Sequence, residues 1–318
     1  MRSGFILAIL VATLVATTLQ ADRNINPTET RINVGNTSLY VREVGKGQPV
    51  LILHGGPDFD HTYLLPDLDR LQDRFRLIYY DQRGRGKSAQ NVRPEDVALN
   101  SDVADIDRIR QQFRLNSVVL LGHSWGTVLA LEYALRHPTH VSHLILMNPA
   151  PASTADVKAF RKIYLEKLGD QADRQRAIMA IPEYQAGDPA TVAARYRIHF
   201  KPALARRADY EKLMTTMETA FKSQGSEGIL KARAVEDRLM LDTWQLESYD
   251  LMPRIRSLRI PTLIIAGDHD FFPLEIADHI AKALPNAKLV TIKDCGHFAY
   301  LECPNELRTT LDDFFKQR

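Results

Sequence analysis

The sequence predicts an α/β protein in which helices cover both faces of a mostly parallel sheet. Six short apolar runs, among them LILHG, VVLLGH and TLIIAGD, are nearly continuous rather than alternating, as in strands buried on both faces. Helical patterns separate several of these runs, and such alternation is typical of a parallel sheet with right-handed crossovers. Residues 151–250 have almost no strand-like runs and predict a helical insertion.

The composition is that of a folded protein without the charge excess of a nucleic-acid binder. The chain has 318 residues, 45% of them hydrophobic, which is enough for a large core that carries an insertion. Its 41 lysine and arginine residues nearly balance 39 aspartate and glutamate residues, and no long block of one sign occurs. We therefore expect no nucleic-acid partner.

Residues 1–21 have the layout of a secretory signal peptide. One arginine precedes an apolar stretch at residues 5–15, and small and polar residues then lead to Ala21. An uncleaved membrane anchor is the alternative, but the stretch is shorter than the roughly 18 residues that a span requires. We expect export to the periplasm or the outside of the cell, cleavage near Ala21 and no stable membrane span afterwards.

The elements follow one another in an order that suits this fold class. Residues 31–44 form two β-rich runs around Gly35 and Asn36, which predicts a hairpin. The later strand runs are PVLILHG, RLIYYD, SVVLLGHS, HLILMNP, PTLIIAGD and KLVTIKD, and we expect helices at residues 94–113, 125–137, 274–284 and 305–315. Ligand sites in such sheets lie at the carboxyl ends of the strands.

The insertion divides the chain into a core in two parts, residues 22–150 and 251–318, and a helical cap, residues 151–250. The charges of the cap nearly balance, although its run RYRIHFKPALARR carries five basic side chains and no acid. We interpret that run as a solvated helix face, and contact with an acidic ligand is the alternative.

Ser124 lies in GHSWG, residues 122–126, between a predicted strand and a predicted helix. This context matches the G-x-S-x-G turn, which strains the serine backbone and exposes the hydroxyl above the strand ends. The following helix directs its first amides toward the same point and favours negative charge there. The motif predicts a nucleophile, and a serine that only caps the helix is the alternative.

A serine nucleophile needs a base and an orienting carboxylate, which follow this motif in the order acid, histidine. LIIAGDHD ends one strand run and offers Asp268 and Asp270, and KDCGHF ends the next and offers His297 on a glycine-marked turn. We predict Asp270 as the acid because it should reach from the loop to Nδ1 of His297. Asp268 is placed to stabilise the turn through its own backbone.

The developing oxyanion requires two amide donors. One is the amide of Trp125, which follows the nucleophile, and the other comes from the loop after the third strand, LHGGPDF. Gly55 and Gly56 let this loop approach the substrate closely, and we expect the Gly56 amide to be the donor. A tight turn that needs a positive φ angle is a second role, compatible with the first.

The sequence predicts neither a cofactor nor a metal. DQRGRGKS, residues 81–88, lacks the order and spacing of a phosphate-binding loop and predicts a structural turn. HPTHVSH lies in a helix-to-strand connection without a carboxylate partner, so we expect no metal ion there. Cys295 and Cys303 either pair in a disulfide or remain two small hydrophobic side chains.

Together, HGGP, DQRGRGKS, GHSWG, GDHD and GHF resemble the α/β-hydrolase superfamily over essentially the whole chain after the leader. Within it, HGGP, DQRG and the tryptophan after the nucleophile resemble the proline iminopeptidases, serine aminopeptidases that release an N-terminal residue, often proline, from peptides. The resemblance implies an eight-stranded sheet, a helical cap after the sixth strand and an acyl-enzyme mechanism without a cofactor. It also implies the roles given above to Ser124, Asp270 and His297.

Two positions near the mouth of the site depart from that family. The family usually has glycine where this chain has Asp58, after HGGP, and glycine where this chain has His123, before the nucleophile. It also recognises the substrate amine with carboxylates of the cap. Glu218, Glu236 and Glu247 are the candidates here, and an ordinary surface role is the alternative for each.

The sequence thus predicts an exported serine hydrolase that acts on short peptides as a proline-type aminopeptidase. The enzymatic alternative is an esterase or lactonase that acts on a small apolar ester, and a buried acid in the cap would discriminate the two. The alternative from another class is a ligand-binding homologue with little turnover.

Overall fold

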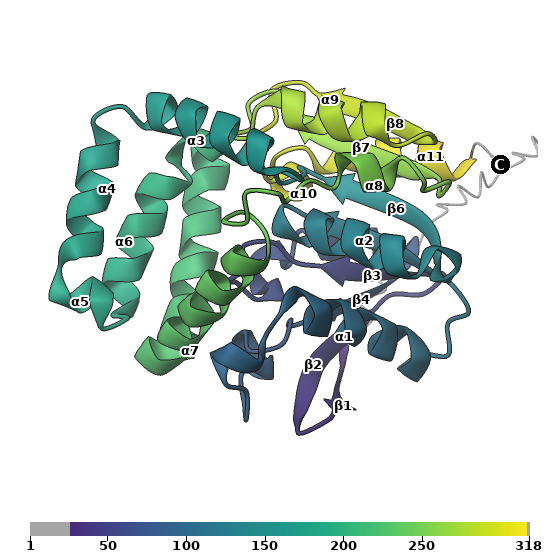
Figure 1. Cartoon of the computed structure of the whole chain (residues 1–318), viewed down its shortest axis with the longest axis horizontal. Coiled ribbons are helices and arrows are strands. Elements are labelled where there is room, and N and C mark those ends of the chain that lie inside the picture. Colours follow the sequence, from purple (N-terminus) through teal and green to yellow (C-terminus); the bar gives the residue numbers. More distant parts are fainter. Residues whose placement is uncertain (1–25, 317–318) are drawn as a thin grey trace, which may run out of the picture.

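The computed structural model describes residues 26–316, so the predicted signal peptide lies outside the described residues. Eight strands form one sheet in the order β1-β2-β4-β3-β5-β6-β7-β8 (Figure 1). β1 pairs with β2 and β2 pairs with β4 in antiparallel orientation, whereas every other pair is parallel. The predicted α/β class and the implied number of strands are confirmed.

The strands coincide with the apolar runs of the sequence. Every residue of β5 and of β7 is buried, as expected for strands that are covered on both faces. The expected hairpin is formed by β1 and β2. The bounds are β1 Thr28–Val34, β2 Thr37–Val44, β3 Gln48–Leu53, β4 Phe75–Tyr80, β5 Val118–His123, β6 Val141–Met147, β7 Thr262–Gly267 and β8 Ala287–Ile292.

The four predicted core helices begin close to their predicted positions, with one exception, and two short helices at residues 252–255 and 299–302 were not predicted. The helix expected from residue 94 begins at Leu99, because Val97 and Ala98 are extended and the Ala98 amide donates to the Ser101 hydroxyl at 2.9 Å. The bounds are α1 Leu99–Gln112, α2 Trp125–Arg136, α8 Met252–Ile255, α9 Leu274–Ala283, α10 Ala299–Glu302 and α11 Pro304–Lys316.

Five helices, α3 to α7, are inserted between β6 and β7 and lie beside the sheet on the left of Figure 1. The longest of them breaks at Gly225, whose φ of +66° is a conformation that residues with a Cβ atom rarely adopt. The segment after this break carries Glu236. The bounds are α3 Thr154–Leu168, α4 Gln171–Ala180, α5 Pro182–Gln185, α6 Pro189–His199 and α7 Arg207–Asp242.

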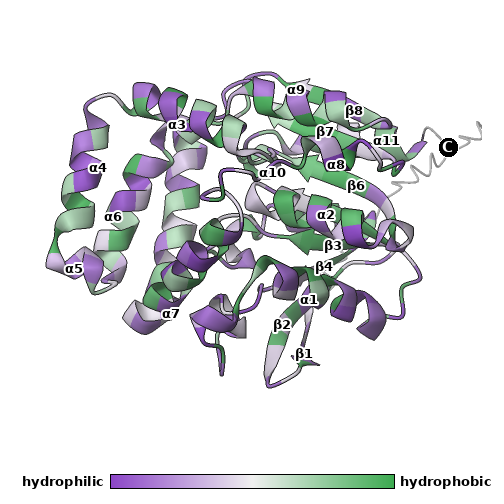
Figure 2. Cartoon of the chain, in the orientation of Figure 1, coloured by the Kyte–Doolittle hydropathy of each residue, from purple (hydrophilic) through white to green (hydrophobic). Residues whose placement is uncertain are grey.

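Hydrophobic residues concentrate on the central strands and on parts of the helices that cover them (Figure 2). The inserted helices alternate more strongly between hydrophilic and hydrophobic positions, as expected for a layer with one wetted side. Among residues 26–316, no helix is both long and apolar enough to cross a membrane.

Candidate active site

Ser124 occupies the turn between β5 and α2, where the motif places it. Its φ is +54°, which is uncommon for a residue with a side chain and typical of strained functional turns. The Ser124 amide donates to the Met147 carbonyl at 3.1 Å, and its carbonyl accepts from the Thr127 amide at 2.9 Å. Because the hydroxyl does not cap α2, the alternative role as a capping serine is excluded.

The predicted acid and base lie side by side. Nδ1 of His297 is 2.9 and 3.0 Å from the two carboxylate oxygens of Asp270, and both residues are buried. Asp268 is exposed and contacts His269 instead, at 2.7 Å. A carboxylate can only accept from Nδ1–H, so Nε2 of His297 is left as the basic nitrogen.

Ser124 and His297 line the same cavity. Within residues 26–316, no hydrogen bond joins the serine hydroxyl to the imidazole. Such contacts are often long in substrate-free hydrolases and tighten when the substrate binds. The structure thus brings the three predicted residues to one site, and their catalytic roles stay a prediction.

Asn148 supports the acid and was missed by the sequence analysis. Its Nδ2 donates to Oδ2 of Asp270 at 2.9 Å and to the carbonyl of Gly296 at 3.0 Å. The Phe272 amide donates to the other oxygen of Asp270 at 2.9 Å. The one available signal was its place directly after β6, at the carboxyl edge of the sheet.

The predicted oxyanion donors face the same cavity. Gly56 and Trp125 both line it beside Ser124, and φ of Gly56 is +49°, so the expected positive-φ turn is present. The preceding amide, that of Gly55, donates to the Tyr63 hydroxyl at 2.6 Å. The Gly56 amide has no partner among the described residues and is therefore the one available to a substrate.

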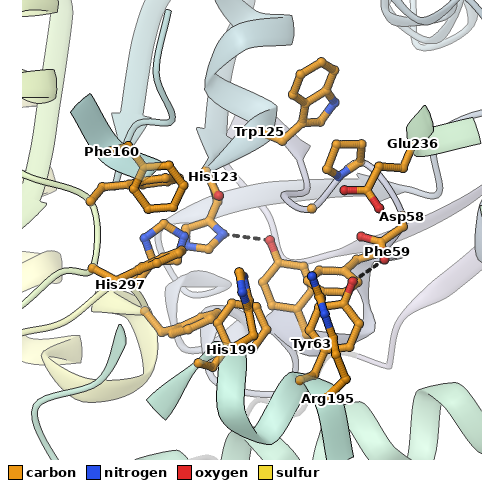
Figure 3. Close-up of a pocket in the computed structure, with 18 of the residues that line it drawn as sticks. Asp58, Phe59, Tyr63, His123, Trp125, Phe160, Arg195, His199, Glu236 and His297 are labelled. Atoms are coloured by element: carbon orange, nitrogen blue, oxygen red, sulfur yellow. Dashed lines mark hydrogen bonds between the residues drawn. The ribbon is translucent and has the colours of Figure 1, made fainter. Parts of the chain in front are cut away.

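A cluster of ionisable side chains lies on the side of this cavity away from His297 (Figure 3). It consists of Asp58 from the loop after β3, Arg195 from α6 and Glu236 from α7. The cavity encloses about 120 Å³, and about half of the residues that line it have Phe, Tyr or Trp side chains. These side chains are Phe59, Tyr63, Trp125, Phe160, Tyr196, Phe200, Trp244, Phe271, Phe272 and Phe298.

Glu236 is the only one of the three candidate cap glutamates that lines this cavity among the described residues. Glu218 accepts from Arg197 at 2.7 Å, and Glu247 is exposed. The solvated-face interpretation of the basic run is wrong for Arg195, because its guanidinium lies in the cavity over the Tyr196 ring. Helical periodicity could not assign Arg195 to the inner side of the cap, since the run as a whole is polar.

The two carboxyl groups of this cluster resist ionisation. Burial and the Asp58 carboxylate raise the pKa of Glu236 from its ordinary value of 4.5 to about 8, and Arg195 opposes the rise. Burial also raises the pKa of Asp58, against the effect of the hydrogen bond from Tyr196. Nε of Arg195 is buried without a hydrogen-bond partner in the described part of the chain. A cationic ligand group beside these acids would lower their pKa values and be bound by the resulting carboxylates.

The loop that carries His297 is fastened at both ends. Cys295 and Cys303 form a disulfide, which decides between the two alternatives that the sequence left open. Within this loop, the buried Glu302 carboxylate accepts from the amides of Gly296 at 2.8 Å and of Ala205 at 2.7 Å. It thereby joins the histidine loop to the cap, a role that the sequence did not indicate.

The histidine-rich connection does have a carboxylate partner, contrary to the reasoning from the sequence. Asp107 of α1 lies 3.1 Å from Nδ1 of His140, and His137 is close by. The sequence hides this contact because Asp107 precedes His140 by about thirty residues in the chain and meets it only in the fold. The carboxylate already accepts from Arg110 and Tyr133, each at 2.8 Å.

Residues 48–304 match the family of proteins with the alpha/beta hydrolase fold. The chain belongs to this family. Its full-length relatives include a proline iminopeptidase of Heyndrickxia coagulans, 29% identical over 275 residues that cover 86% of this chain and 92% of that protein. Another is a proline iminopeptidase of Saccharolobus solfataricus, 26% identical with 87% of each chain covered. The α/β-hydrolase fold and the distant similarity to proline iminopeptidases confirm the resemblance drawn from the motifs.

Solved structures of this hydrolase family have other activities in their names as well. An esterase of Exiguobacterium antarcticum is similar with a TM-score of 0.67 and 24% identity, and the match covers 91% of this chain and 100% of that one. At this identity the similarity shows the fold alone, so the choice of substrate must come from the cavity.

Proposed function

We propose that this α/β hydrolase is a serine aminopeptidase that releases a small N-terminal residue, such as proline, from short peptides. The observation that carries the proposal is the carboxyl group of Glu236, which the cap holds in the cavity that Ser124 lines. This half-buried acid makes no hydrogen bond among the described residues, so its carboxylate is free to bind the ammonium group of a peptide. The relatives named proline iminopeptidase support the same substrate class.

The proposed chemistry uses two acyl-transfer steps. Ser124 attacks the carbonyl of the N-terminal residue while Nε2 of His297 takes the hydroxyl proton and Asp270 holds the imidazolium. The amides of Gly56 and Trp125 stabilise the oxyanion, and the leaving amine departs with the proton of His297. Water, deprotonated by the same histidine, then cleaves the acyl-serine and releases the amino acid.

The size and charge of the cavity favour a small residue with a free amine. The cavity, at about 120 Å³, is small for a ligand pocket, which favours a small N-terminal residue over a long acyl chain. The aromatic walls suit an apolar ring. An ammonium group beside Glu236 would lower the pKa of that acid and be held by the resulting carboxylate.

The test compares arylamides of proline, alanine and leucine with their N-acetylated forms and with simple aryl esters. We expect release of the free amino acids, loss of turnover in Ser124→Ala, and a rise in KM of about tenfold or more in Glu236→Gln, on the scale of a lost charge-assisted hydrogen bond. Glu247→Gln, an exposed glutamate of the same region, is the matched control. Ester turnover without any arylamide turnover would leave an esterase or lactonase instead.

We also propose that the protein is exported. The leader-like residues 1–21 are one support, and the Cys295–Cys303 disulfide is the other, because disulfides persist mainly in oxidising compartments. Fractionation of the native host should place the protein outside the cytoplasm, with an N-terminus shortened by about twenty residues. Recovery of the uncleaved chain from the cytoplasm would refute this proposal.

A further inference from the structure

His123 is a polar side chain at the centre of the site that the proposed mechanism does not use. It ends β5 directly before Ser124 and is only 1% exposed. Its Nδ1 lies 2.7 Å from the Tyr63 hydroxyl (Figure 3), and its Nε2 lies 2.9 Å from the carbonyl oxygen of His297. A buried imidazole with both nitrogens engaged is held in one orientation.

Tyr63 and His123 thus connect the Gly55 amide to the His297 carbonyl through a chain of hydrogen bonds. The groups at its two ends determine the direction of each hydrogen bond. The carbonyl of His297 can only accept, so Nε2 of His123 carries a proton. Burial lowers the pKa of His123 well below its ordinary value, so the ring is neutral and Nδ1 is an acceptor. The Tyr63 hydroxyl therefore donates to Nδ1 and accepts from the Gly55 amide at 2.6 Å.

The two ends of this hydrogen-bond chain belong to two different parts of the proposed catalytic machinery. Gly55 precedes Gly56, whose amide is the proposed oxyanion donor, and the other end is the backbone of the proposed base, His297. We propose that Tyr63 and His123 are positioning residues. They fix the loop of Gly55 and Gly56 and the loop of His297 at the correct distance from each other around Ser124. The inference rests on the serine mechanism proposed above.

The relative position of the two loops matters because the rate depends on how accurately the oxyanion donors and the base are placed around the reacting carbonyl. The oxyanion donors must stand about 2.7–3.1 Å from the developing charge, and a displacement of about 1 Å can cost about a hundredfold in rate. Without the Tyr63 hydroxyl, the Gly55 amide loses its acceptor, and Nδ1 of His123 loses its donor. The loop of Gly55 and the His123 ring then each lose one of the contacts that fix their position relative to the nucleophile.

The experiment compares Tyr63→Phe, His123→Leu and the double variant by kcat, KM and melting temperature on the best arylamide or ester. We expect each single variant to lower kcat roughly 10- to 100-fold with KM changed less than threefold. Because both substitutions interrupt one chain, the double variant should lose no more than the worse single variant. His123→Gln, which restores an N–H donor toward His297, should recover part of kcat.

Tyr133→Phe is the matched control. Tyr133 lies near the end of α2, and its hydroxyl donates to Asp107 of α1 at 2.8 Å. The substitution therefore removes an equivalent hydrogen bond outside the site. We expect this control to lower the melting temperature without changing kcat. Unchanged kcat in Tyr63→Phe and His123→Leu, or losses that multiply in the double variant, would overturn the inference.

A fluorophosphonate probe separates this inference from the proposed function. Labelling of Ser124 needs the nucleophile, the base and the oxyanion hole but no particular substrate. An unlabelled native protein would overturn the serine mechanism and the inference with it. Native labelling with equal rate constants in Tyr63→Phe and His123→Leu would overturn the inference alone, whereas slower labelling in both is the expected result.

Discussion

The Glu236→Gln substitution should make the protein more stable at neutral and alkaline pH while it impairs recognition of the substrate amine. The side chain keeps its size, and Glu236 makes no hydrogen bond among the described residues that the amide would lose. What changes is the ionisable proton, together with the repulsion from Asp58. Binding sites often retain such unfavourable groups at the expense of stability.

The size of the effect follows from the pKa of Glu236, which is 4.5 ordinarily and about 8 in the folded protein. Between these values the folded state holds a proton that the unfolded chain releases, so stability falls as the pH rises through this window. If the whole shift applies, Glu236 lowers the free energy of unfolding by about 3 kcal/mol at pH 7, at about 1.36 kcal/mol for each pH unit above 4.5. Because Glu236 is partly exposed to the cavity, water there reduces the figure, and we expect a gain of about 1–3 kcal/mol.

The assay is urea unfolding of the native protein, Glu236→Gln and the exposed control Glu247→Gln between pH 4 and pH 9. Native protein and Glu236→Gln should have similar unfolding free energies near pH 4 and diverge as the pH rises to about 8. The control should follow the native curve throughout. Parallel curves for the native protein and Glu236→Gln, or a less stable Glu236→Gln at pH 9, would refute the reasoning about this carboxyl group.

Three further substitutions test the structure around the base. Asp270→Asn should lower kcat by roughly 10³- to 10⁴-fold, because the amide cannot hold the imidazolium, and kinetics on any substrate of the native protein checks this. In Glu302→Gln, the side-chain NH2 group would face the amide of Gly296 or of Ala205, so one of these two hydrogen bonds is lost. The unfolding free energy measured in urea should therefore fall by about 1–3 kcal/mol. Cys303→Ser opens the disulfide with Cys295 and should cost about 2–3 kcal/mol, a loss that reductant should reproduce in the native protein but not in the variant.

Much of the fold was predictable because its local patterns agree with its tertiary structure. The fully buried strands read as continuous apolar runs, and the turn at Ser124 is fixed by its flanking glycines and by its place between strand and helix. The helix expected from residue 94 began late because a side-chain hydrogen bond from Ser101, rather than the hydrophobic period, sets its first turn. Boundaries of this kind depend on single contacts that periodicity does not report.

The residues that support the site were harder to predict than those that line it. Asn148 donates a hydrogen bond to Asp270, which is distant in the chain, and Glu302 accepts hydrogen bonds from loop amides. Neither residue lies in a recognisable motif. Arg195 could not be assigned to the cavity because a helix face is polar whether it meets water or a charged ligand. Glu236 could be named as a candidate from its residue type, but only the packing of α7 over the cavity distinguishes it from the other two glutamates.

The two departures from the family pattern have different physical consequences. Asp58 adds a carboxyl group beside Glu236, so it changes the electrostatics at the substrate end of the cavity. His123 engages Tyr63 and the backbone of His297, so it changes how the catalytic residues are held in place. Substitution of Asp58 should therefore act mainly on KM and on amine selectivity, whereas substitution of His123 should act on kcat for amide and ester substrates alike. A loss of kcat in Asp58→Gly that is equal for acetylated and free-amine substrates would contradict this separation.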